Sequence, residues 1–205
     1  MRRSAILAAA ALLALPAAAG AGSKLQRVAA TAPTCSPATS KLFEQFGDAG
    51  LYFVAPGGTF EGTANAWALS GQAAIATGNE TFFITGPGTT SLKIAGAGTA
   101  TSAPVCISAA DATVRFLIRN TGAAAARLAL DVTYTRPDGV VATTQVASLA
   151  GTSTWSPTPV VYYLANVLAF FSTTGTANVA FGVRALDSKG IWQIDDFSID
   201  PYKRV

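Results

Sequence analysis

The sequence predicts an all-β protein, a two-layer antiparallel β-sandwich (jelly roll) with one short helical or irregular segment near residues 160–171. Two observations lead to this expectation. Many short apolar runs are separated by turns rich in glycine and proline, which is typical of sandwiches and barrels. No internal repeat and no long amphipathic helix interrupts the series. With 205 residues, the chain is long enough for one domain with a sizeable core.

The first residues have the features of a secretory signal. The basic residues Arg2 and Arg3 precede an apolar run over 6–15 and small residues over 17–19, which suit signal cleavage. This run is shorter than the roughly 20 residues of a membrane span, so none is expected after cleavage. We expect a secreted, extracellular protein with a signal peptide (1–21), a flexible leader (22–34) and a β-sandwich domain (35–202).

The amino-acid composition argues against several classes of function. Of the 14 basic residues, Arg2 and Arg3 leave with the signal, and the other 12 are scattered and balanced by 11 acidic residues. Nucleic acid is therefore not an expected partner, because its binding needs a clustered basic surface. Histidine is absent, which removes the usual general base and the commonest transition-metal ligand. Only 12% of the residues are charged, so the surface must be rich in small polar residues.

The two cysteines, Cys35 and Cys106, are expected to form a disulfide, because the chain is directed to an oxidising compartment. The bond would close a loop of about 70 residues and contribute about 4 kcal/mol in the chain-entropy model. The alternative is two free, buried thiols.

The first half of the domain contains short predicted strands. The clearest covers residues 113–119, where Val114, Phe116 and Ile118 alternate with Arg115 and Arg119. Because side chains alternate between the faces of a strand, the three apolar residues should point inward. Further strands are expected at 51–54, 67–75, 91–94 and 105–107, with a single turn or extended piece at 41–46 and a small-residue loop at 96–103.

A hairpin is expected in the second half. Residues 128–135 alternate apolar with polar side chains, residues 136–139 (Arg-Pro-Asp-Gly) have turn chemistry, and residues 140–149 return as the partner strand. The apolar run over 160–171 is too short to cross a membrane. We expect it to cover one end of the sandwich, with Leu164, Val167, Leu168 and Phe171 directed toward the core.

The last strand is expected over residues 190–201, after another at 179–184. Its apolar residues change face along the way, since Trp192 and Ile194 share one parity and Phe197 shares the other with Ile199. This change predicts a β-bulge or a twist at Asp195-Asp196, or burial on both sides.

Taken in order, these elements resemble the jelly-roll carbohydrate-binding modules of the galactose-binding-like type. The resemblance covers most of the chain, from Cys35 to Pro201, but its motifs are short. The chain is also similar to a group of secreted bacterial proteins that end in a Trp-Gln-Ile-Asp-Asp strand and an Asp-Pro-Tyr tail. The residues that carry the likeness to the modules are Phe60-Glu61, Trp67, Gly71, 91–94, 115–118 and 192–197.

The resemblance implies a structural calcium ion. In such modules a glutamate after the early phenylalanine and an aspartate in the last strand commonly hold calcium, and the matching positions are Glu61 and Asp195. Carbonyl groups of the loop at 56–58 could complete the shell. In the alternative, Glu61 accepts backbone N–H groups and Asp195-Asp196 caps a bulge in solvent.

The resemblance also implies a sugar site built on aromatic side chains. Trp155, Tyr162 and Tyr163 are the candidate ligand-binding residues, whereas Tyr134 is in phase with inward residues. Trp155 lies in a Thr/Ser/Pro loop, which favours exposure. The alternative is that Trp155 packs onto the edge of the core.

Enzymatic catalysis is not expected. The chain has no Gly-x-Ser-x-Gly or Ser-x-x-Lys motif, and adjacent carboxylates such as Asp195 and Asp196 point to opposite faces of a regular strand. We therefore expect a secreted, non-catalytic protein that binds polysaccharide or cell-envelope glycan. The alternative is a structural or protein-interaction module of the cell surface without a small-molecule site.

Overall fold

The computed structural model describes residues 35, 37–62 and 66–200. The predicted signal peptide and leader lie outside the described residues, as do residues 201–205. Within the described part of the chain, no helix is both long and apolar enough to cross a membrane.

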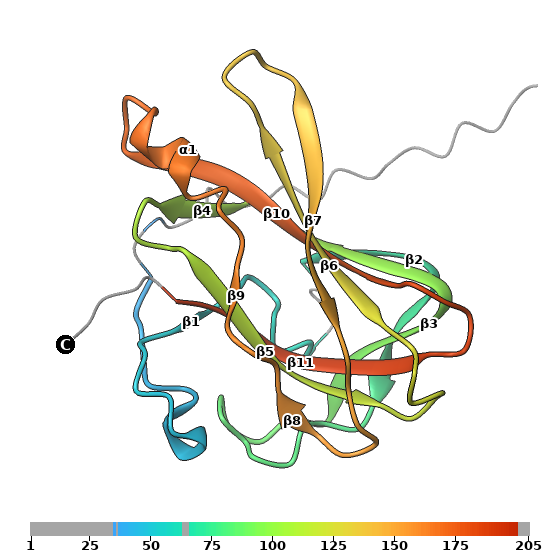
Figure 1. Ribbon diagram of the computed structural model, residues 1–205. Coiled ribbons are helices and arrows are strands. Elements are labelled where there is room, and N and C mark those ends of the chain that lie inside the picture. The colour runs from blue at the N-terminus through green and yellow to red at the C-terminus, as the bar shows by residue number, and fades with distance from the viewer. Residues whose placement is uncertain (1–34, 36, 63–65, 201–205) are drawn as a thin grey trace, which may run out of the picture.

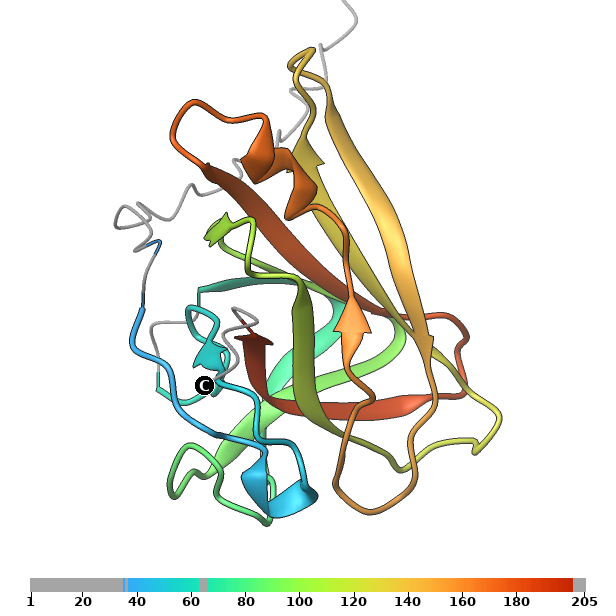
Figure 2. The same cartoon turned by 60° about the vertical axis from the view of Figure 1, so that its left-hand side comes forward.

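The predicted fold class is confirmed. The described residues form one 11-stranded antiparallel sheet, and four residues form the single α-helix among them. The sheet curls around its core, with β6, β7 and β10 on one side and β5 and β11 on the other (Figures 1 and 2). In chain order, the elements are η1 (Glu44–Phe46), β1 (Phe53–Val54), β2 (Trp67–Thr77), β3 (Thr90–Ser102), β4 (Val105–Ser108), β5 (Thr113–Asn120), β6 (Leu128–Thr135), β7 (Val141–Leu149), β8 (Ser156–Pro157), β9 (Val161–Tyr162), α1 (Val167–Phe170), β10 (Thr176–Ala185) and β11 (Ile191–Asp200).

Strand β3 connects the two layers. The sheet order is β7-β6-β10-β3-β11-β5-β8, so β3 lies between the strands of both layers. Its first half pairs with β11 through residues 92–95, and its second half pairs with β10 through residues 99–101. Along its other edge β3 pairs with β2 over nearly its whole length. One long, bent strand therefore folds the sheet over into a sandwich.

The bend in β3 corrects the expected loop at residues 96–103. Residues 96–102 continue the strand, and the register of the β2–β3 pair shifts between Ser70 and Gln72. Gly71 and Gly96 both have positive φ values, of 61° and 51°. A Cβ atom on Gly71 would lie 2.7 Å from the carbonyl oxygen of Ala97. The glycines therefore form a bulge in which two backbones approach closely, and they do not end the strand.

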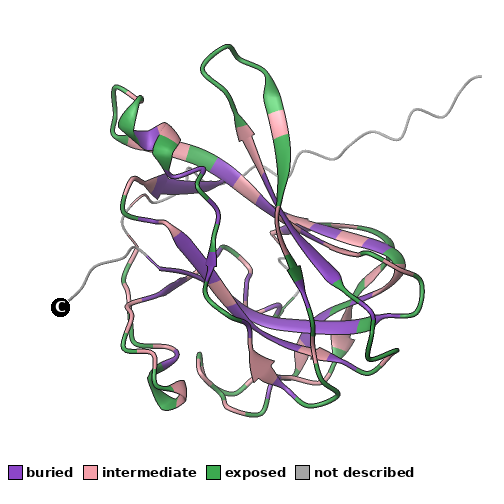
Figure 3. Cartoon of the chain, viewed as in Figure 1, coloured by how far each residue is buried: buried purple, intermediate pink, exposed green. Residues whose placement is uncertain are grey.

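The core lies between the layers and is rich in aromatic rings. As predicted, Val114, Phe116 and Ile118 are buried in it. The ring of Phe197 stacks on Phe116 at 5.0 Å between centroids and contacts Trp67 at 5.2 Å. Such pairs add to the stabilisation from burial. In Figure 3 buried residues predominate along β5 and β11 through the centre of the molecule, whereas in β10 they alternate with partly buried ones.

A second apolar cluster covers the outer face of β5, which the alternation pattern did not predict. Phe43, Tyr52, Leu117 and Trp155 form this cluster, and all four are buried. The segment before β1 supplies the first two, so it lies over the sheet. The side chain of Arg115 points outward as predicted, but it forms an ion pair with Asp48 of this segment and is mostly shielded from solvent.

The predicted bulge in the last strand is confirmed. β11 pairs with β3, β5 and β1, and its register against β5 shifts between Asp195 and Ser198. Asp196 takes a left-handed φ of 51°. Every residue of β11 except Ile191 is buried. The change of apolar parity thus reflects both expected causes, a bulge and burial on two sides.

The predicted disulfide between Cys35 and Cys106 is present, with 4.9 Å between the Cα atoms. It joins the start of the described chain to β4, and no other cysteine exists in the sequence. A bond across 71 positions restricts the unfolded chain strongly.

The predicted hairpin is formed by β6 and β7, which pair over their whole length around the turn at 136–139. The apolar run after it differs from expectation. Leu164 and Phe171 are largely exposed, and only Leu168 of the four predicted side chains packs partly against the core. The reason is geometric, because α1 has a single turn and small residues such as Ala169 occupy its buried side.

Candidate pocket beside the short helix

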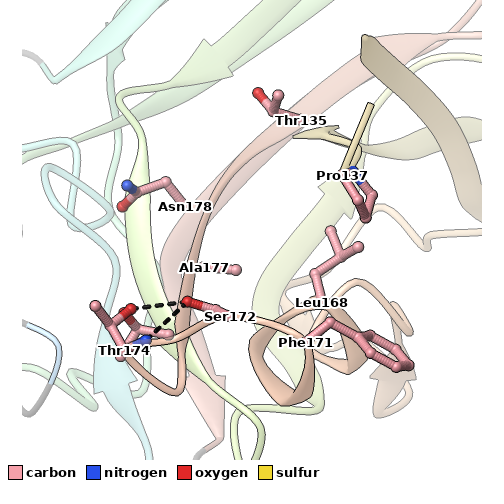
Figure 4. Close-up of a pocket in the computed structure, with 9 residues that line it drawn as sticks. Thr135, Pro137, Leu168, Phe171, Ser172, Thr174, Ala177 and Asn178 are labelled. Carbon is pink, nitrogen blue, oxygen red and sulfur yellow. Dashed lines mark hydrogen bonds between the residues drawn. The ribbon is translucent and has the colours of Figure 1, made fainter. Parts of the chain in front are cut away.

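A shallow pocket of about 450 Å³ lies where three elements meet. The end of β6 and the hairpin turn form one side, α1 and the turn after it form another, and the first residues of β10 form the floor (Figure 4). Its lining residues are Thr135, Pro137, Leu168, Phe171, Ser172, Thr174, Thr176, Ala177 and Asn178.

The two sides of the pocket differ in chemistry. Pro137, Leu168 and Phe171 gather on one side, while Ser172, Thr174 and Asn178 lie on the other (Figure 4). The ring of Phe171 is 77% exposed, so its face is available to a ligand. None of the lining residues is charged. The pocket can therefore offer an apolar surface and hydrogen bonds to the same small, neutral group.

The polar side is preorganised by hydroxyl groups. The oxygen of Thr174 lies 2.8 Å from that of Ser172 and 2.8 Å from that of Thr176. The backbone N–H of Thr174 also donates to the hydroxyl of Ser172, at 3.2 Å. Gly175, with a φ of 69°, makes the turn that carries this chain of hydroxyls into β10. Three hydroxyl groups are thus held in a row.

Exposed aromatic rings concentrate in the same segment. Tyr162, Phe170 and Phe171 are exposed, and among the described residues the other large exposed ring is Phe83, in the loop before β3. Three exposed rings within ten positions are unusual on a protein in which most other described aromatic residues are buried or partly buried.

The three predicted ligand-binding residues are not brought together at one surface. Tyr162 is 59% exposed, but Tyr163 is 3% and Trp155 6% exposed. The hydroxyl of Tyr163 donates to the carbonyl oxygen of Asp111, and burial raises its pKa. Trp155 packs in the second apolar cluster, and the guanidinium of Arg119 lies over its ring at 4.9 Å. Trp155 is therefore packed at the edge of the core, as the alternative expected, and is not exposed for ligand binding.

A buried group of carboxyls surrounds the bulge of β11. Asp195 accepts from the backbone N–H of Glu80 at 3.1 Å, and Asp196 accepts from the hydroxyl of Thr85 at 2.6 Å. Burial and the charge of Asp196 raise the pKa of Asp195 to about 8. Burial also raises the pKa of Asp196 to about 7, although the hydrogen bond from Thr85 opposes this. These carboxyls fix the loop before β3 onto the last strand.

Glu61 makes a different set of contacts. Its Oε1 accepts the backbone N–H groups of Thr89 and Thr90, each at 2.7 Å. Although slight burial acts in the other direction, these bonds hold the pKa of Glu61 below its usual value. Glu61 therefore accepts backbone N–H groups, as expected in the alternative to the calcium site. Asp195, in contrast, is buried and not in solvent.

The calcium prediction can be compared with this geometry. Among the described residues, no group of three or more acidic or cysteine side chains is arranged to hold a metal ion. Calcium takes six to eight oxygen ligands, and Glu61 already uses one oxygen for two N–H groups. The predicted calcium site at Glu61 and Asp195 stays a prediction.

The residues of the pocket were missed by sequence reasoning. The apolar run at 160–171 was a signal, but it predicted burial and not exposure. Pro137 was assigned only to a turn, and nothing in the sequence indicates that this turn lies beside Phe171.

Comparison with family models gives no match, and comparison with curated protein sequences gives none either. The fold is similar to that of the CBM22-1 xylan-binding domain of Xyn10C from Paenibacillus barcinonensis. The TM-score is 0.52 at 18% identity, over 83% of this chain and 99% of that one. At this identity the likeness shows a carbohydrate-binding-module-like β-sandwich and no more.

Two other solved structures are similar at lower scores. A xylan-binding CBM22 domain matches with a TM-score of 0.48 and 16% identity, over 77% of this chain and 99% of that one. The CBM22-1-GH10 modules of Clostridium thermocellum Xyn10B, complexed with xylohexaose, match with a TM-score of 0.48 and 15% identity. That match covers 69% of this chain and 27% of the other. Neither adds to what the first likeness shows.

Proposed function

We propose that the protein is a non-catalytic glycan-binding module, and that one neutral sugar unit occupies the pocket beside α1. The observation that carries this proposal is the division of the pocket into an apolar side, with the exposed ring of Phe171, and a hydroxyl and amide side. A pyranose has the same division, with C–H groups on its faces and hydroxyls at its rim. The uncharged lining fits a neutral sugar.

The fold supports this proposal without specifying the ligand. The first similar structure is a xylan-binding domain, and the Xyn10B structure joins a CBM22-1 module to a GH10 module. Xylan is therefore a reasonable first polysaccharide to test. Secretion is part of the same proposal, because such polysaccharides lie outside the cell. The proposal of secretion rests on the signal peptide predicted from the sequence.

The direct test compares two exposed phenylalanines. Xylo-oligosaccharides and a panel of soluble neutral polysaccharides are titrated into the wild-type protein, Phe171→Ala and Phe83→Ala by calorimetry. Phe83 is also exposed but lies in the loop before β3. We expect the affinity to fall by about 5- to 150-fold in Phe171→Ala, because an aromatic stacking surface contributes about 1–3 kcal/mol, and to persist in Phe83→Ala. Equal binding by all three proteins would contradict the proposed site.

The alternative, a structural or protein-interaction module, is separated by the same experiment. Exposed Leu164, Phe170 and Phe171 would also suit contact with another protein. Absence of binding to every glycan of an array and to insoluble polysaccharides would favour that alternative.

The predicted calcium ion has its own test. If calcium is held through Glu61 and Asp195, millimolar calcium raises the melting temperature above that in excess EDTA, because a ligand that binds only the folded state stabilises it. An unchanged melting curve would remove calcium from the account. The sugar site does not depend on the outcome, since neither residue lines the pocket.

A further inference from the structure

The outer face of β5, β11 and β3 carries a row of three polar side chains, remote in sequence from the pocket. Gln193 of β11 is directly opposite Arg119 of β5 and directly opposite Lys93 of β3. Residues that are opposite each other in a sheet point to the same face, and neighbouring strands are about 4.8 Å apart. Lys93 and Arg119 therefore flank Gln193, with about 10 Å between their Cα atoms.

Arg119 is held in place by two contacts. Its Nε donates to Oε1 of Gln193 at 2.7 Å, and its guanidinium lies over the ring of Trp155 at 4.9 Å. The amide of Gln193 is fixed in turn, because its Nε2 donates to the hydroxyl of Ser91 at 3.1 Å. Within the described ranges, the bond to Gln193 is the only hydrogen bond of the Arg119 side chain. The guanidinium is thus oriented before any ligand arrives.

Among residues 35, 37–62 and 66–200, neither cation has a negatively charged partner. All 11 acidic side chains of the sequence lie within the described residues. The four ion pairs found there use Lys41, Arg115, Arg136 and Arg184. In a chain with only 12% charged residues, two unpaired cations on either side of a fixed amide are a concentrated positive site.

We infer that this row, Arg119-Gln193-Lys93, binds the carboxylate of a uronic acid unit, so that the glycan is an acidic polysaccharide with both neutral and charged sugars. This inference rests on the proposed function, because the carboxylate is taken to belong to a sugar. The planar fork of an arginine matches a carboxylate, and exposed Lys93 adds a second charge from the opposite side. Gln193 sets the position of the arginine.

The test uses two ligands that differ only at the carboxyl group, which is a free carboxylate in one and a neutral methyl ester in the other. Short oligogalacturonates and their methyl esters are titrated into the wild-type protein at low ionic strength. We expect the acid to bind about tenfold more tightly than the ester, with a preference that shrinks as salt is added. Equal affinities would overturn the inference.

Variants locate the charge. Arg119→Gln and Lys93→Gln should each remove most of the preference for the acid, whereas Lys189→Gln, which removes an exposed lysine of a turn, should keep it. A preference that survives both substitutions would also overturn the inference. Arg119→Gln would be uninformative if it unfolded the protein by uncovering Trp155. Lys93→Gln then tests the inference alone, since Lys93 is exposed and makes no ion pair among the described residues.

The two proposals can fail separately. Phe171→Ala should reduce binding of neutral oligosaccharides and leave the preference for acid over ester unchanged. If neutral sugars bind through Phe171 and no acid preference exists, only the carboxylate site is wrong. If the acid binds through Arg119 and Lys93 but Phe171→Ala changes nothing, only the pocket is wrong.

Discussion

At the scale of single residues, the surroundings of a side chain decide its role more than its type does. Trp155 lies in a loop of threonine, serine and proline, which favours exposure, yet it is buried by a segment about 110 positions earlier in the chain that supplies Phe43 and Tyr52. No pattern in the sequence around Trp155 predicts its contact with Phe43 and Tyr52. Asp195-Asp196 is the opposite case, because the change of apolar parity around it predicts the bulge from the sequence alone.

Trp155→Ala tests the buried position. Removing a large ring from the second apolar cluster should lower the free energy of unfolding by about 3–5 kcal/mol, as expected for a large-to-small change in a core. Urea denaturation followed by far-UV circular dichroism measures this. A loss below about 1 kcal/mol would mean that the ring is exposed in solution.

The two buried aspartates predict a pH dependence of stability. Their pKa values are raised to about 8 and about 7 in the folded protein, from an ordinary value of 3.8. Between the unfolded pKa of 3.8 and the folded pKa values, the folded state therefore binds more protons than the unfolded state. The two aspartates therefore contribute to the free energy of unfolding fully below the unfolded pKa, and this contribution is lost as the pH rises through the folded pKa values.

Melting temperatures measured in EDTA should accordingly fall as the pH rises from about 4 to about 8. Asp196→Asn should flatten this profile, because an amide cannot ionise. Asp138→Asn, at an exposed position in the hairpin turn, is the matched control and should leave the profile unchanged. A wild-type profile that rises over the same range would contradict the raised pKa values.

At the scale of elements, strands with clear alternation are predictable and bent ones are not. The alternation in β5 and the hairpin of β6 and β7 follow from local pattern and turn chemistry. The glycines at 96–98 suggest a loop when read locally, but β2, β10 and β11 pair with β3 on either side of them and keep the strand continuous. The exposure of Phe170 and Phe171 is equally non-local, because it depends on which side of α1 packs inward, and Ala169 occupies that side.

Gly71→Ala tests the bulge that bends β3. The new Cβ would lie 2.7 Å from the carbonyl oxygen of Ala97 at a φ of 61°, so both sterics and backbone strain oppose it. We expect a loss of about 2–4 kcal/mol in the free energy of unfolding. Gly139→Ala in the hairpin turn is the control, because its φ is 81° and a Cβ there would meet no described atom within 4 Å beyond its chain neighbours, and it should cost about 1 kcal/mol. Equal losses would show that close packing at Gly71 is unimportant.

At the scale of the whole molecule, composition and turn spacing predict the sandwich, and the cysteine count together with the expected compartment predicts the disulfide. The position of the candidate pocket could not be predicted, because it depends on three elements that meet only in the folded chain. The pocket and the Arg119-Gln193-Lys93 row lie on different elements, so substitutions at one need not alter the other.

The most direct test of the central claim is an NMR titration of the isotope-labelled protein with a neutral xylo-oligosaccharide. The account predicts that the largest shift changes fall on Phe171, Thr174 and Asn178, which line the pocket. The account would be contradicted by saturable binding whose shift changes lie elsewhere and leave these three residues unaffected, or by the absence of binding to any neutral glycan.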